Sequence, residues 1–157
     1  MKEVISKIFI AAIIALLFIN FTAVKTYKLT AFDVELDVAI SSEPKTVVQF
    51  PPIGTLSAAT HWAPINLKLT LEAIHQEKLA DIISDLKTKQ ELFSLLQKRG
   101  RIILRFFLLR VIALGFLGGI IGMGLFELSR FSLISGGIVG ILVVILLSSL
   151  VYYSYDI

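Results

Sequence analysis

Three long runs without a charged residue dominate this sequence of 157 residues. They span residues 8–24, 111–126 and 131–153 and are 17, 16 and 23 residues long. A helix needs about 20 mainly apolar residues to cross the hydrocarbon core of a bilayer, so the runs predict membrane-spanning helices. The composition agrees, because 56% of the residues are hydrophobic and only 17% are charged. The chain contains no cysteine, which argues against disulfide-stapled and zinc-ribbon proteins.

The first run follows Lys2 and Lys7 and has the form of an export signal. It ends in residues 20–24, NFTAV, and this end fits poorly the pattern of small residues that a signal peptidase cleaves. We therefore favour an uncleaved signal anchor over residues 1–24, with a cleaved signal peptide as the alternative.

Residues 25–97 have ordinary polarity, and their first half alternates as β-strands do. In residues 32–40 the acidic side chains share one strand face and the apolar ones share the other. Shorter strands are expected at residues 46–50, 55–60 and 65–72, between turn signals. The alternation changes phase near Ala31, which predicts a bulge or bend there. Together these segments predict a small, mostly antiparallel sheet of about four strands with one apolar face.

Helical spacing follows the strands. Four apolar residues predict a helix that covers the sheet, and they are Leu79, Ile82, Ile83 and Leu86. Thr88 and Glu91 fit a capping box, from which a second helix would continue past Gly100 and across the membrane as one rod. The predicted fold class is an α+β integral membrane protein. It has three transmembrane helices and a small sheet-plus-helix module between the first and second.

Residues 98–126 combine a basic collar with the second span, and residues 131–153 form the third. Only four residues separate these spans, so they must form an antiparallel hairpin. We expect Arg105 and Arg110 to extend toward the lipid headgroups. Tyr152 and Tyr153 are expected at the interface where the third span leaves the membrane.

Eight of the ten glycines lie in the second and third spans. Several are four residues apart, a spacing that lets helix backbones approach closely. These pairs are Gly115 with Gly119, Gly118 with Gly122, and Gly136 with Gly140. We favour helix packing within the hairpin over a dimerisation motif as the role of these glycines.

The basic residues give conflicting indications of orientation. A positive-inside count places residues 25–97 in the cytoplasm, but loops longer than about 60 residues translocate largely regardless of charge. Because the chain starts like an export signal, we predict that the N-terminus is inside. Residues 25–97 and the C-terminus would then be outside. The bilayer is the predicted partner, and the net charge of +3 reflects basic residues at membrane borders rather than nucleic-acid binding.

The sequence contains no recognisable catalytic constellation. It has two histidines, His61 and His75, without paired metal-ligand spacing, and it has no phosphate-binding loop. Asp33, Glu35 and Asp37 could bind a cation, but a solvated acidic strand face is more common. His61 could be a ligand or a pH sensor, but a structural histidine bonded to a backbone carbonyl is more common. No cofactor is expected within these 157 residues.

Several stretches together resemble a known family. They are residues 31–36, AFDVEL; residues 50–61, FPPIGTLSAATH; residues 63–69, APINLKL; and a basic helix with a glycine-rich hairpin that ends in Tyr155-Asp156. The pattern resembles the N-terminal region of bacterial membrane-anchored metallophosphoesterases. Its most specific part is a motif of unknown role that comprises Pro51, Pro52, Gly54, Thr60 and His61.

The resemblance implies that an extracytoplasmic module and a transmembrane hairpin precede a phosphoesterase domain in the bacterial cytoplasmic membrane. The metal-binding motifs of that family are absent here, so divalent metal ions are expected only in a downstream catalytic domain. We therefore predict the anchor and accessory region of a phosphoesterase, which is not catalytic in these residues. The alternative is a small non-enzymatic membrane protein, either an envelope sensor or an accessory subunit of a membrane complex.

Overall fold

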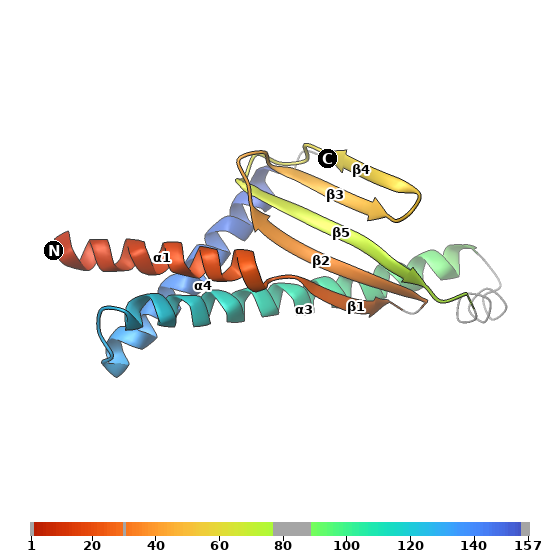
Figure 1. The fold of residues 1–157 in the computed structure, drawn as a ribbon. Coiled ribbons are helices and arrows are strands. Elements are labelled where there is room, and N and C mark those ends of the chain that lie inside the picture. Colours follow the sequence, from red (N-terminus) through yellow and green to blue (C-terminus); the bar gives the residue numbers. More distant parts are fainter. Residues whose placement is uncertain (1, 30, 77–88, 155–157) are drawn as a thin grey trace.

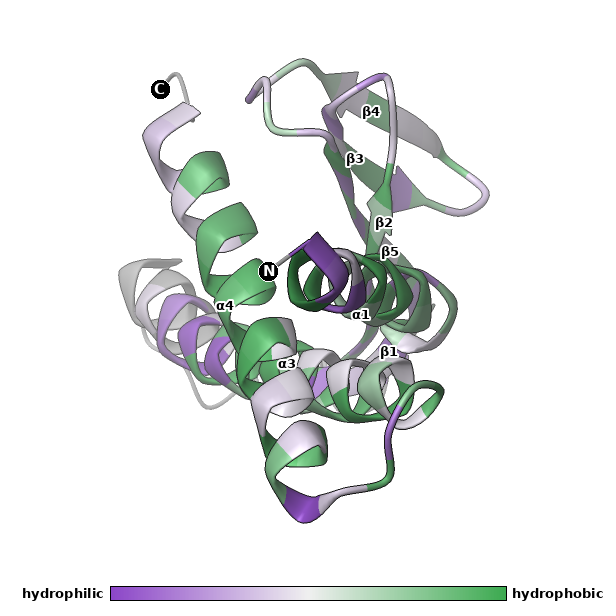
Figure 2. Cartoon of the chain, turned by 90° about the vertical axis from the view of Figure 1, so that its left-hand side faces the viewer, coloured by the Kyte–Doolittle hydropathy of each residue, from purple (hydrophilic) through white to green (hydrophobic). Residues whose placement is uncertain are grey.

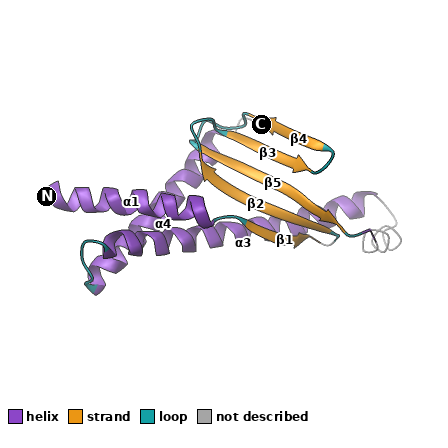
Figure 3. Ribbon diagram, in the orientation of Figure 1, coloured by secondary structure: helices purple, strands orange, loops and turns teal. Residues whose placement is uncertain are grey.

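The computed structural model describes residues 2–29, 31–76 and 89–154 (Figure 1). Three helices lie side by side, and a single sheet extends from one end of them. The elements in chain order are α1 (Lys2–Thr22), β1 (Lys25–Leu29), β2 (Phe32–Ile40), β3 (Lys45–Phe50), β4 (Gly54–Ala58), β5 (Ile65–Ile74), α3 (Lys89–Gly124) and α4 (Arg130–Ser154). Figure 3 shows the helical part and the sheet, with β1 lying along α3. The predicted combination of three helices with a sheet between the first and second is confirmed.

Each of the three helices contains a segment that is long and apolar enough to cross a membrane. These segments are Lys2–Thr22, Gln97–Gly124 and Arg130–Ser154. Hydrophobic residues predominate along all three (Figure 2). The arrangement is compatible with a membrane location. The prediction of one long rod is confirmed, because α3 continues without a break through Gly100.

The helix α3 lies between α1 and α4 and contacts α1 through two glycines. A Cβ atom added to Gly118 would lie 2.8 Å from the Cα of Ala15, and one added to Gly122 would lie 2.7 Å from the Cα of Ala11. Real Cβ atoms essentially never approach another atom this closely. The backbones of α1 and α3 can therefore touch only because these positions carry no side chain.

A second pair of glycines on α3 contacts α4. Gly115 lies against Gly140, and Gly119 lies against Gly136. A Cβ atom at any of the four would meet a backbone carbonyl oxygen of the opposite helix. All six glycines of the predicted pairs thus lie at contacts between helices. Four of them pack within the α3–α4 hairpin as predicted, but the prediction was wrong for Gly118 and Gly122, which pack against α1.

The sheet differs from the prediction in strand number and in one pairing. It has five strands in the order β1-β2-β5-β3-β4, and β3 pairs in parallel with β5 while the other neighbours are antiparallel. The predicted number of about four strands was therefore one too few, whereas the prediction of a mostly antiparallel sheet is confirmed, with the pairing of β3 and β5 as the parallel exception. β2 and β3 are consecutive and run in opposite directions, but β5 lies between them. Being antiparallel to β2, β5 must be parallel to β3.

The change of phase near Ala31 is a hairpin rather than a bulge. Leu29 of β1 pairs with Phe32 of β2, and Tyr27 pairs with Val34. Odd residues of β1 therefore share a face with even residues of β2, which looks like a phase change along the sequence. A register shift does occur, but between Asp33 and Val34 in the pairing of β2 with β5. The predicted covering helix and the threonine of the capping box lie outside the described residues.

One face of the sheet is apolar and turns toward the helices. In β2 this face carries Val34, Leu36 and Val38, and the residues paired with them in β5 are leucines at 71, 69 and 67. Leu36 and Val38 pack against a cluster that includes Phe107 and Val111 of α3. The helices, rather than a separate layer, thus cover part of the sheet.

Replacement of Gly119 by valine is expected to separate α3 from α4, because the new side chain would meet the carbonyl of Gly136. Overpacking of this kind costs about 1–3 kcal/mol or more. The free energy of unfolding, measured by denaturing-detergent titration of the purified chain, should fall accordingly. The matched control is Gly100→Ala, which adds a Cβ with no other atom within 4 Å. Equal unfolding midpoints for the two variants would contradict the packing.

Candidate functional site

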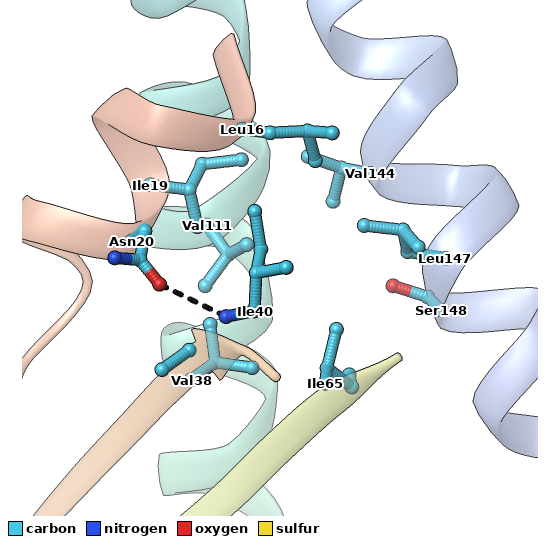
Figure 4. Close-up of a pocket in the computed structure, with 11 residues that line it drawn as sticks. Leu16, Ile19, Asn20, Val38, Ile40, Ile65, Val111, Val144, Leu147 and Ser148 are labelled. Carbon is cyan, nitrogen blue, oxygen red and sulfur yellow. Dashed lines mark hydrogen bonds between the residues drawn. The ribbon is translucent and has the colours of Figure 1, made fainter. Parts of the chain in front are cut away.

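The C-terminal end of α1 meets the sheet and α3 at a junction held by two polar side chains. The Oδ1 atom of Asn20 accepts a hydrogen bond of 2.9 Å from the backbone N–H of Ile40, the last residue of β2 (Figure 4). The Nη2 atom of Arg110 donates a bond of 3.0 Å to the backbone carbonyl of Thr22, the last residue of α1. These bonds link α1 to both the sheet and α3.

The bond from Arg110 has a clear physical basis. The last four carbonyls of a helix lack partners within the helix, and they form the negative end of its dipole. A guanidinium at that position satisfies a carbonyl and interacts favourably with the dipole. An arginine next to an apolar span is thereby paired with backbone of the same chain.

The other residues predicted at the membrane border are exposed. Arg105 lies on the surface of α3, more than one turn before Arg110. Tyr152 and Tyr153 are 81% and 86% exposed at the end of α4, and their rings meet edge to face with centroids 6.0 Å apart. The position of these four residues relative to lipid headgroups stays a prediction.

Apolar side chains from all three helices form the core of the junction. Its buried members are Ile19, Ala23, Phe107, Val111 and Val144. The ring of Tyr27 in β1 meets that of Phe107 edge to face, with centroids 6.4 Å apart. Next to this core is a small pocket of about 60 Å³ lined from α1, α3, α4, β2 and β5 (Figure 4).

The motif with Pro51, Pro52 and Gly54 forms the turn of the β3–β4 hairpin, at the edge of the sheet away from α1. The Pro51–Pro52 bond is cis, and Gly54 has a φ of +156°, which side-chain-bearing residues rarely adopt. Every residue of β4 is exposed. This part of the motif shapes an accessible edge of the module.

Thr60 and His61 have a different environment from the rest of the motif. His61 is only 6% exposed, and its Nε2 atom lies 2.9 Å from the carbonyl oxygen of Ile65. Since a carbonyl can only accept, Nε2 carries the proton. The Nδ1 atom then accepts from the hydroxyl of Thr60 at 3.0 Å, and that hydroxyl lies 2.6 Å from the hydroxyl of Thr46. These bonds connect β3 with the corner that leads into β5.

The second histidine has an acidic partner that sequence reasoning missed. The Nε2 atom of His75 lies 3.2 Å from Oδ2 of Asp33. The two residues are 42 positions apart, and only the pairing of β2 with β5 brings them together. No local spacing signals this contact. One of the three acidic residues considered for cation binding is thus paired with an imidazole.

The junction contains a small, mainly apolar pocket, and the β3–β4 hairpin forms an exposed edge of the sheet. Among the described residues, no group of three His, Cys, Asp or Glu side chains could hold a metal ion. Comparison with protein-family models, curated proteins and solved structures gave no match to this chain. The resemblance to membrane-anchored metallophosphoesterases therefore stays a hypothesis from the sequence.

Substitution of His61 by alanine is expected to destabilise the sheet, because it leaves the carbonyl of Ile65 and the hydroxyl of Thr60 without these partners. The hydroxyl of Thr60 keeps its contact with the hydroxyl of Thr46, so the main cost comes from the carbonyl of Ile65. Leaving a buried acceptor unsatisfied costs about 1–3 kcal/mol. Thermal unfolding of the purified chain, followed by the circular dichroism of the strands, should show a lower midpoint. The neighbouring control Trp62→Ala alters a side chain that is 64% exposed and should change the midpoint much less. The reverse order would contradict a structural role for His61.

Proposed function

We propose that this chain is the membrane anchor and extracytoplasmic accessory region of a metal-dependent phosphoesterase. The observation that carries this proposal is the position of the end of α4. Tyr152 and Tyr153 line the same cleft as Ile65 and Leu67 of β5, so the last described turns of α4 lie beside the sheet. A domain attached after α4 would emerge next to the sheet rather than at the opposite end of the helices.

The junction supports the role of an anchor that fixes orientation. The bond of Asn20 holds the end of β2 against the last turns of α1, and the bond of Arg110 holds the end of α1 against the middle of α3. Only two residues separate α1 from β1. A domain that contacts this sheet would have a defined position relative to the membrane.

The β3–β4 hairpin gives an attached domain a surface to contact. Ile53 at the turn is 86% exposed, and Leu56 in β4 is 67% exposed. The hairpin also contains the stretch on which the resemblance mainly depends. The alternative of a non-enzymatic sensor or subunit was based on the glycine stripes, which here pack against helices of the same chain.

The proposed orientation can be tested directly because the chain has no native cysteine. Thr55→Cys places a thiol on the exposed strand β4, and Leu128→Cys places one in the exposed turn between α3 and α4. A membrane-impermeant maleimide should label the first variant in intact cells. The second should react only after permeabilisation. The reverse pattern would overturn the proposed topology.

The enzymatic part of the proposal predicts a catalytic domain downstream in the same gene. The reading frame after residue 157 is expected to encode Asp-x-His, Gly-Asp-x-x-Asp, Gly-Asn-His and Gly-His motifs. Membranes that contain the whole product should hydrolyse bis(p-nitrophenyl) phosphate, with loss of activity in EDTA and recovery with Mn²⁺. Ile53→Asp with Leu56→Asp should reduce this activity, whereas Lys25→Gln with Lys28→Gln, at exposed residues on the opposite edge of the sheet, should not. A frame that closes after residue 157 would contradict the covalent arrangement.

A further inference from the structure

A large apolar cleft opens between the sheet, α3 and α4. It has a volume of about 680 Å³, within the range of small-molecule sites. Its walls are apolar side chains from four elements, β2, β5, α3 and α4, with Ser148 and two tyrosines as the polar exceptions. α3 and α4 touch at their glycines and diverge toward the sheet (Figure 1). The residues that line the cleft on α3 and α4 lie beyond these glycines, on the side of the sheet.

The cleft continues along the two spanning helices. A second hollow of about 310 Å³ shares Leu108, Ser148, Tyr152 and Tyr153 with the first. From there it extends past Ile112 of α3 and Ile145 of α4. Both walls belong to segments that are apolar enough to cross a membrane. A cleft between two such helices opens toward the acyl chains of the surrounding lipid.

A basic hollow lies on α3 next to the apolar cleft. Lys98, Arg101 and Arg105 line it, and all three are exposed. Arg101, Arg105 and Leu108 follow one another at i, i+4 and i+7, which places them on one face of the helix. No acidic residue occurs between residues 92 and 126, so this stretch of α3 carries only positive charge.

We propose that this cleft binds one anionic phospholipid. The phosphate would lie against Arg101 and Arg105, and an acyl chain would occupy the cleft below the sheet. The tyrosines at the rim have an apolar ring and a polar hydroxyl, which suits the glycerol region between phosphate and chain. Charge complementarity favours an anionic headgroup over a zwitterionic one. The proposal does not depend on a phosphoesterase domain.

The test uses the whole purified chain in a mild detergent and native mass spectrometry. Dioleoyl phosphatidylglycerol and dioleoyl phosphatidylcholine are titrated separately, because they have the same chains and differ in headgroup charge. One phosphatidylglycerol molecule should remain bound with clearly higher affinity than phosphatidylcholine. Arg101→Gln with Arg105→Gln should weaken phosphatidylglycerol binding by about thirtyfold and remove the preference. Lys25→Gln with Arg99→Gln removes the same charge at exposed residues that line neither hollow and should leave binding unchanged.

Ser148→Trp tests the cleft itself, because a bulky ring there would fill the space shared by the two hollows. It should reduce the binding of both lipids, whereas Leu142→Trp on the exposed side of α4 should not. Leu67→Trp fills the cleft from the sheet side and replaces Ser148→Trp if that variant fails to fold. Equal affinity for the two lipids, or unchanged binding in the arginine variant, would overturn the proposal. A concentration-dependent dimer that Ser148→Trp abolishes would also overturn it, in favour of a second copy of the chain as the occupant.

Discussion

The close approach of α3 to both of its neighbours is the constraint on which the rest of the structure depends. Helices in a bilayer gain little from hiding apolar surface, because lipid tails are as apolar as leucine. Their association must come from close packing, which glycine permits. α3 carries two such surfaces, with Gly118 and Gly122 toward α1 and Gly115 and Gly119 toward α4. Because the two pairs are offset by three residues, one helix can hold two partners at once.

That packing sets the position of the sheet. With Ala11 and Ala15 of α1 against α3, the last turn of α1 comes within reach of Arg110, whose guanidinium satisfies a carbonyl at the helix end. The chain then enters β1 after two residues, and Tyr27 meets Phe107. The packing of the helices therefore determines where the sheet lies. The covered part of its apolar face lies on β1 and β2, where these strands pack against α3.

The sequence predicted the parts that local periodicity determines. Charge-free runs indicated the three long apolar helices, and alternation and turn signals indicated β2 and the approximate positions of β3, β4 and β5. It did not predict what depends on distant pairing. No local pattern indicates that β5 lies between β2 and β3 in the sheet. The hairpin after Leu29 changes the phase of the alternation in the same way as a bulge would, so the sequence alone does not distinguish the two. Likewise, Arg110 bonds a carbonyl 88 residues away, and the partners of Asn20 and His75 emerge only from the fold.

The proposed lipid cleft is a consequence of the same constraint. Gly140 is the last glycine of α4, and a run of branched, bulky residues, ILVVILL, follows it. α3 has Leu108 and Ile112 at the corresponding level, so the two helices cannot remain in backbone contact toward the sheet. The sheet covers only the upper side of the space that results. An empty apolar space forfeits the dispersion contacts of every atom that lines it. In a bilayer the nearest molecule able to restore those contacts is a lipid, and the arginines at the rim favour one that is negatively charged.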